Sequence, residues 1–241
     1  MHYESCVFPK RVKLMTQVLI YPKTAAVKIP THEVTYARLR DMILYGELAP
    51  GQPVTIQGLI ADLGAGMTPV REAIRRLAAE GALLPQGNRR VSVPRLSAAD
   101  LEQLAFVRLT IEPRLAQMAA AHVTPDLLAR LVTLNAEVDR TVAAGDVQGY
   151  LQSNHAFHFT LYAAAGAGVL LDMAQSLWLR FGPSLRVVTQ LSGRASLPDS
   201  HLDIIEALRA GRGDVAATAL ARDIELGVGH VREGAQGVPI I

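Results

Sequence analysis

The chain has few of the features that mark secreted or membrane proteins. Its 241 residues include one cysteine, Cys6, which excludes a disulfide framework and a cysteine-based zinc site. No apolar run approaches the ~20 residues that a membrane-spanning helix needs. Aromatic residues make up only 5% of the chain, while alanine and leucine are abundant, which favours a mainly helical protein. We expect a cytoplasmic protein with no membrane partner.

The charges are divided unevenly along the chain. Residues 1–96 contain 13 Lys and Arg against 7 Asp and Glu, a net +6, and residues 97–241 contain 11 against 15, a net −4. A basic part joined to an acidic part favours a polyanion-binding module attached to a domain with another task. We therefore expect a flexible basic extension (1–32), a DNA-binding domain (33–96), a helical domain (97–232) and a tail (233–241).

Residues 55–95 hold the most specific pattern. After a first helix over 34–45, Thr55 can cap a second helix, and Gly64-Ala-Gly66 makes a turn. Thr68 and Pro69 then have the form of an N-cap followed by proline at the first helical position. Two short helices joined by such a turn, with a basic hairpin after them, predict a winged helix-turn-helix whose last helix enters the DNA major groove.

Several polar side chains of this segment are candidates for DNA contact. Arg71 and Arg75 are four residues apart and share one helix face. The first turn of a recognition helix reaches base edges, so Thr68 and Arg71 are the leading base-reading candidates, and Arg75 is expected nearer phosphate. Short strands at 83–84 and 91–93 predict a wing. The DNA-contact set is Gln57, Thr68, Arg71, Arg75, Arg89 and Arg90.

The run from Tyr36 to Gly51, followed by Thr68-Pro-Val-Arg-Glu-Ala-Ile-Arg-Arg-Leu77 and Glu80-Gly81, resembles the winged helix-turn-helix of GntR-family transcription regulators. The resemblance implies that residues just before and within this motif contact operator bases. Where that family usually has a Ser/Thr-Arg pair, this chain has Gly66-Met67. Met67 cannot make a bidentate contact with guanine. The departure implies an unusual operator, or more reliance on Arg71, Gln57 and the wing.

Residues 97–231 show no strand-like alternation. They predict an antiparallel helical bundle, so the fold class is mainly α, with a winged helix-turn-helix before the bundle. Ser97, Thr124, Asp146 and Asp214 are suitable N-caps. The helices are expected at roughly 98–121, 125–144, 147–165, 168–191, 198–211 and 214–231.

Two polar residues interrupt the inward seam of the third bundle helix, Asn154 and His158. A buried polar group costs about 1–3 kcal/mol when unpaired, so each needs a partner. A core Asn and His bonded to backbone or water is the simplest interpretation. The alternative is a divalent-cation site, because His201 and Glu225 lie on two further helices and could converge with them. We expect the nearby His155 to be exposed.

This half resembles the FCD effector domain of FadR-type GntR regulators through Arg108-x-x-x-Glu112, Asn154-x-x-Phe-His158 and His201-x-x-Ile. In metal-containing members, an Asp or Asn and three His bind zinc or nickel, and a small carboxylate effector often completes the shell. The resemblance implies Asn154, His158 and His201 as ligands. The place of the third histidine is assigned to Glu225, a departure that adds negative charge.

Arg108 has two interpretations. Its guanidinium fork matches an effector carboxylate, but it can equally pair with Glu112, four residues on. The sequence as a whole predicts a homodimeric, ligand-responsive repressor of a near-palindromic operator. One alternative is the same regulator with a metal-free pocket that uses Arg108. A distant one is a metal-dependent hydrolase with an accessory DNA-binding module, for which no HExxH or Gly-x-Ser-x-Gly motif is present.

Overall fold

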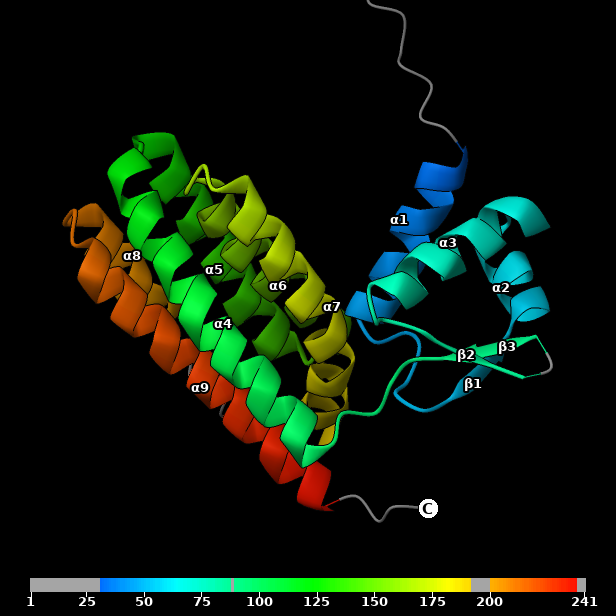
Figure 1. Cartoon of the computed structure of the whole chain (residues 1–241). Coiled ribbons are helices and arrows are strands. Elements are labelled where there is room, and N and C mark those ends of the chain that lie inside the picture. Colours follow the sequence, from blue (N-terminus) through cyan, green and yellow to red (C-terminus); the bar gives the residue numbers. More distant parts are fainter. Residues whose placement is uncertain (1–30, 88, 192–199, 238–241) are drawn as a thin grey trace, which may run out of the picture.

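The protein folds as a small N-terminal domain beside a larger helical bundle (Figure 1). We describe this fold from a computed structural model, which covers residues 31–87, 89–191 and 200–237. The mainly α class and the order of the two parts are as predicted. The expected extension (1–32) lies almost entirely outside the described residues. No helix in the described part of the chain is long and apolar enough to cross a membrane.

The N-terminal domain packs three helices against a small sheet. The sheet is antiparallel with strand order β1-β3-β2, and Val91 of β3 lies opposite Val54 on one side and Pro85 on the other. The elements are α1 (Thr31–Leu44), β1 (Pro53–Thr55), α2 (Ile56–Leu63), α3 (Met67–Ala79), β2 (Leu84–Gln86) and β3 (Arg90–Ser92). The wing strands are shifted slightly from their predicted positions, and β1 was not predicted.

Of the two helix N-caps predicted in this domain, one is confirmed and one is wrong. Thr55 caps α2, because its hydroxyl accepts from the backbone N–H of Gly58 at 3.0 Å. Thr68 is not an N-cap: Gly66 holds that position without a side-chain hydrogen bond, and α3 begins at Met67. Pro69 is therefore the third helical residue, where its missing N–H costs nothing, since the first four N–H groups of a helix have no intrahelical partner.

The helical domain follows the predicted helices closely. The caps at Ser97, Thr124 and Asp146 are present, whereas Asp214 lies within the first turn of a helix that starts at Gly213 and runs past the predicted end. Residues 198 and 199 of the predicted fifth helix lie outside the described residues. The elements are α4 (Ala98–Ala119), η1 (Ala120–His122), α5 (Pro125–Ala144), α6 (Val147–Ala163), α7 (Gly168–Leu191), α8 (His201–Arg209) and α9 (Gly213–Gly237).

Each domain has its own apolar core. The larger core lies between the bundle helices and includes Phe157, Leu161 and Ile204. The smaller core is built from α1, α2, α3 and the wing, and two residues of α7, Trp178 and Leu179, belong to it. Helix α7 thus lies at the junction of the two domains (Figure 1).

Candidate functional site

The outer surface of α3 presents a free arginine. Arg71 is exposed and makes no salt bridge with any residue that the structure describes. Thr68 in the first turn of α3 and Gln57 on α2 are exposed as well. Arg75 is also exposed, but its Nη2 donates to Glu72 at 2.8 Å. Of the two α3 arginines predicted to contact DNA, Arg71 is therefore the more available one.

Another arginine of α3, Arg76, connects this helix to α1. Arg76 donates to Glu33 of α1 at 2.8 Å and lies 3.8 Å above the centre of the Tyr36 ring. The Tyr36 hydroxyl donates to Glu80 at 2.9 Å. Burial, followed by this hydrogen bond and by the charge of Glu80, raises the pKa of Tyr36 to about 12. These contacts fix α3 against α1, so its outer face is held in place.

The wing carries the remaining candidates. Arg89 and Arg90 are exposed, and Arg89 adopts the left-handed backbone conformation with φ of 59°. Its carbonyl accepts from the N–H of Ile56 at 3.0 Å, which ties the wing to the start of α2. The two cations therefore project from a hairpin that is anchored to the rest of the domain.

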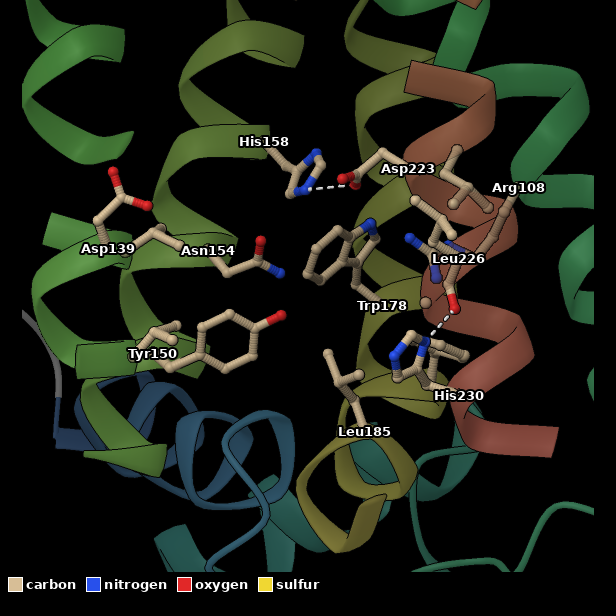
Figure 2. Close-up of a pocket in the computed structure, with 15 residues that line it drawn as sticks. Arg108, Asp139, Tyr150, Asn154, His158, Trp178, Leu185, Asp223, Leu226 and His230 are labelled. Atoms are coloured by element: carbon tan, nitrogen blue, oxygen red, sulfur yellow. Dashed lines mark hydrogen bonds and ion pairs between the residues drawn. The ribbon is translucent and has the colours of Figure 1, made fainter. Parts of the chain in front are cut away.

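A cavity of about 90 Å³ lies inside the helical domain. Asn154 and His158 of α6, Trp178 of α7 and Asp223 of α9 line it, together with Arg108 of α4. Figure 2 shows the Asn154 amide and the Trp178 ring directed into this space. Its size suits a metal ion and a ligand of a few non-hydrogen atoms.

Three side chains that can ligate a metal meet beside this cavity, and two of them, His158 and Asp223, line it. Nε2 of His158 lies 3.3 Å from Nε2 of His201 and 3.3 Å from Oδ2 of Asp223, and donor atoms of the three residues lie within 4.8 Å of one another. A four-coordinate zinc ion with bonds of about 2.0–2.1 Å would hold its ligands about 3.3 Å apart. The donor spacing therefore fits a small divalent cation.

The neighbours of both imidazoles direct these Nε2 atoms toward one another. Nδ1 of His201 lies 3.0 Å from Oδ1 of Asn135, an acceptor, so His201 carries its proton on Nδ1. Nδ1 of His158 lies 3.2 Å from the Tyr162 hydroxyl, which donates its own proton to Glu112 at 2.6 Å. Such outer partners fix the tautomer of metal-binding histidines. With Nδ1 protonated, the Nε2 of each imidazole can bind a cation, and without one the Nε2 of a doubly protonated His158 can donate to Asp223.

Electrostatics favour a neutral His201 and an ionised Asp223. Burial, and then the charge of His158, lowers the pKa of His201 to about 3, so this imidazole is neutral at physiological pH. Burial alone would raise the pKa of Asp223, but its hydrogen bond to His158 and the charge of that residue bring it to about 2. A neutral imidazole and an ionised carboxylate are the forms that bind metal.

The prediction of Glu225 as a ligand was wrong in its geometry. Glu225 is exposed, outside the cluster of donors, and Asp223 takes its place. The two residues point to nearly opposite sides, since successive helical residues turn by about 100°. The buried face of α9 follows Ala216, Leu220 and Ile224, and Glu225 lies off this face.

Arg108 is committed to an internal partner. Its Nε and Nη2 donate to the two oxygens of Glu112 at 2.6 and 3.2 Å, and both side chains are almost completely buried. Burial alone would lower the pKa of Arg108, but the Glu112 carboxylate raises it. Arg108 also lines the cavity, with Trp178 and Phe181 beneath its guanidinium. The structure thus favours the ion-pair interpretation of Arg108.

The expected exposure of His155 was also wrong. This residue is only partly accessible, stacked on Phe159 at 4.2 Å between ring centres. Its ring meets Tyr45 of the N-terminal domain and Trp178 of α7 edge-on, at 5.9 and 5.6 Å. Burial, followed by the charges of His158 and Arg40, lowers the pKa of His155 to about 3. It turned away from the cavity as predicted, but toward the other domain and not toward solvent.

Comparison with known proteins finds the same two parts in the same order. Residues 31–93 match the family of bacterial regulatory proteins, gntR family, and residues 103–226 match the FCD domain. The HTH-type transcriptional regulator McbR of Escherichia coli K12 is 28% identical over 176 residues, 71% of this chain and 79% of McbR. A probable D-xylose utilization operon transcriptional repressor of Paenarthrobacter nicotinovorans is 29% identical over 205 residues, 83% of this chain and 90% of that protein.

Solved structures show the same fold. E. coli McbR/YncC superposes with a TM-score of 0.81 at 24% identity, covering 85% of this chain and 98% of that one. A GntR regulator from Rhodococcus sp. RHA1 gives a TM-score of 0.69 at 23% identity, covering 84% and 97%.

Proposed function

Because this chain belongs to the GntR family of bacterial transcription regulators, with an FCD domain after its helix-turn-helix, we propose that it is a repressor whose operator affinity is set by a small ligand in the helical domain. The members of this family are DNA-binding regulators and not enzymes. The hydrolase alternative is therefore set aside.

The exposed face of α3 supports the DNA-binding role of particular residues. We propose that Thr68 and Arg71 contact base edges, with Gln57 beside them. Arg75 is assigned to phosphate, because Glu72 already engages part of its fork. Arg89 and Arg90 of the wing are assigned to the backbone or the minor groove. Phosphate contacts position a protein on DNA, whereas base contacts specify the sequence.

The availability of Arg71 leads to a direct test. Arg71→Ala is expected to weaken binding to a selected operator by about 1–3 kcal/mol and to relax specificity at one base position. Arg130→Ala is the matched control, because Arg130 is an exposed arginine of α5 in the helical domain. Titrations on operator fragments and on fragments with the candidate base changed measure both effects. Unchanged affinity would remove Arg71 from the base-reading role.

A homodimer follows from how such domains read DNA. One winged domain covers a short half-site, and two domains related by a two-fold axis require a near-palindromic operator. Sedimentation of the protein with and without an operator duplex gives the stoichiometry. One protomer per duplex at saturation would contradict the dimer.

We propose that His158, His201 and Asp223 hold a divalent metal ion, zinc or nickel, with the Asn154 amide as a further oxygen donor. The observation that supports this proposal is the convergence of two Nε2 atoms and one carboxylate oxygen at 3.3 Å, with an acceptor behind each Nδ1. A bound ion would supply Lewis-acid attraction for a ligand oxygen. Residues on three helices would then be joined through one ion.

The effector is proposed to be a small carboxylate. The cavity of about 90 Å³ favours a small ligand. Since the fork of Arg108 is taken by Glu112, we assign the attraction for a carboxylate to the metal ion. The metal-free alternative would need Arg108 to release Glu112, a buried ion pair whose separation is costly.

Metal analysis of the purified protein decides between these two pockets. We expect about one zinc or nickel ion per chain after incubation and dialysis, and loss of this ion in His158→Ala and His201→Ala. Zinc at 100 times its Kd should stabilise the wild type by about 2.7 kcal/mol. A wild-type protein that takes up no stoichiometric metal would establish the metal-free pocket instead.

A further inference from the structure

Helix α7 is shared between the ligand cavity and the DNA-binding domain. Trp178, Phe181 and Leu185 line the cavity, while Trp178 and Leu179 belong to the apolar core of the DNA-binding domain. The helix is therefore both a wall of the pocket and the surface on which the other domain rests. Trp178, which is 4% exposed, takes part in both, and Figure 2 shows its ring on the cavity side.

Polar contacts attach α7 to the ends of two DNA-binding helices. Arg180 donates from Nε and Nη2 to the carbonyl oxygen of Glu80, the residue that caps α3, at 3.1 and 2.9 Å. Arg186 donates to the carbonyl oxygen of Tyr45, just after α1, at 3.1 Å. The last carbonyls of a helix have no intrahelical partner and carry partial negative charge, so guanidinium groups favour this placement.

A glycine sets how closely α7 approaches α1. A Cβ atom at Gly182 would lie 2.4 Å from the carbonyl oxygen of Leu44 and 3.2 Å from its side chain. The backbones of α7 and α1 are therefore in close contact at this point. A movement of α7 must therefore be followed by the end of α1 or leave a gap between them.

On the cavity side, hydrogen bonds connect Trp178 to the proposed metal ligands. Its Nε1–H donates to Glu112 at 3.0 Å. The same carboxylate accepts from Tyr162, whose hydroxyl lies 3.2 Å from Nδ1 of His158. A continuous path thus leads from His158, through two buried polar groups, to a ring packed in the DNA-binding domain.

We propose that α7 couples the cavity to the DNA-binding domain, with Trp178 as the residue through which cavity occupancy changes the placement of α1 and α3. The proposal rests on the proposed function in that the cavity is taken as the ligand site. A ligand that favours one position of Trp178 shifts the docking of the domain. By reciprocity, a change in docking shifts the affinity of the cavity by the same factor.

The test perturbs the docking face and observes the cavity. Gly182→Ala adds the Cβ that Leu44 obstructs, and it does not weaken α7, because alanine favours helix over glycine. Gly168→Ala is the matched control, on the same helix, where an added Cβ meets no atom within 4 Å. Trp178 is the only tryptophan of the sequence, so its emission reports on the cavity wall. Zinc is a suitable probe, since it has no redox chemistry.

The coupling predicts that Gly182→Ala shifts the emission maximum of Trp178 and changes the zinc Kd by about fivefold or more, while Gly168→Ala does neither. Hydrogen exchange at the ends of α1 and α3 reports the docking itself and should rise in Gly182→Ala. Arg180→Ala, an exposed substitution that removes the contacts to Glu80, is expected to act in the same direction and serves if Gly182→Ala does not fold.

The outcomes separate this inference from the metal proposal. If exchange rises while Trp178 emission and zinc affinity stay at the wild-type values, the coupling is refuted. It is also refuted if the substitution alters neither exchange nor emission. If the wild type binds no zinc, the metal site fails, and hydrogen exchange of cavity-lining residues on α6 and α9 in Gly182→Ala then decides whether docking and cavity are linked.

Discussion

Replacing Glu112 by glutamine is expected to destabilise the helical domain by about 3–5 kcal/mol. Glu112 is fully buried, and its carboxylate accepts from Arg108, Tyr162 and Trp178. Glutamine keeps the shape of this side chain but removes its charge and turns one acceptor into a donor. Arg108, 3% exposed, would lose its counterion, and breaking a buried ion pair from one side costs about 3–5 kcal/mol.

The geometry of the Glu112 carboxylate explains why Glu112→Gln removes a hydrogen bond from Arg108 in particular. Oε2 of Glu112 accepts from Nη2 of Arg108, from Tyr162 and from Trp178, at 3.2, 2.6 and 3.0 Å, while Oε1 accepts only Nε of Arg108, at 2.6 Å. A glutamine amide retains most bonds with its oxygen in the Oε2 position. Its NH₂ group then faces the Nε–H of Arg108, where two donors meet.

Urea unfolding in the presence of EDTA, followed by far-UV circular dichroism and by Trp178 fluorescence, measures this cost. Glu137→Gln is the control, because its ion pair with Arg140 is exposed and is screened by solvent. Arg108→Met combined with Glu112→Gln should recover part of the loss, since the apolar side chain leaves no buried charge. A cost for Glu112→Gln below about 1 kcal/mol, or a double variant no more stable than the single one, would refute the buried-charge argument.

Three further predictions follow from the corrected site and the surfaces. Asp223→Ala should abolish zinc stabilisation of the fold, whereas Glu225→Ala, on the exposed side of α9, should retain it in a thermal melt. The pKa of His155 is about 3 in the fold and about 6.5 when unfolded, so its contribution is complete above pH 6.5 and is lost as the pH falls toward 3. At pH 4.5 the loss is about 2–3 kcal/mol, and equal acid sensitivity of His155→Phe and wild type in urea would contradict it. Arg90→Ala should lower the salt slope of operator binding by about 1; an unchanged slope places Arg90 away from phosphate.

Local signals predicted most of the helices, because each helix carries its own start and stop. Thr124 and Gly145 bracket α5, and both act as caps in the structure. The missed strand β1 has no such signal: its three residues, Pro53–Thr55, are extended because they pair with β3, more than thirty residues away in the sequence. Non-local pairing of a short segment leaves no periodicity to detect.

The same limit explains the ligand error on α9. The choice between Asp223 and Glu225 depends on which stripe of α9 is buried. A stripe through Ala217 and Ala221 competes with one through Ala216 and Leu220. The larger apolar residues Leu220, Ile224 and Val228 recur at four-residue spacing. Asp223 and Glu225 lie about 100° to either side of Ile224, so these larger residues alone do not separate them. The buried Ala216 and Ala219 widen the stripe toward Asp223.

The role of α7 was also partly visible in its sequence. A bundle helix with one apolar partner buries a single stripe, yet Trp178, Leu179, Phe181, Gly182 and Pro183 are almost consecutive and all buried. Burial over more than half of the circumference requires a second partner, which here is the DNA-binding domain. A pattern of this kind in an otherwise amphipathic bundle predicts the helix on which another domain rests. It cannot predict which side chain faces which partner, because that depends on contacts such as Gly182 with Leu44 that only the folded chain brings together.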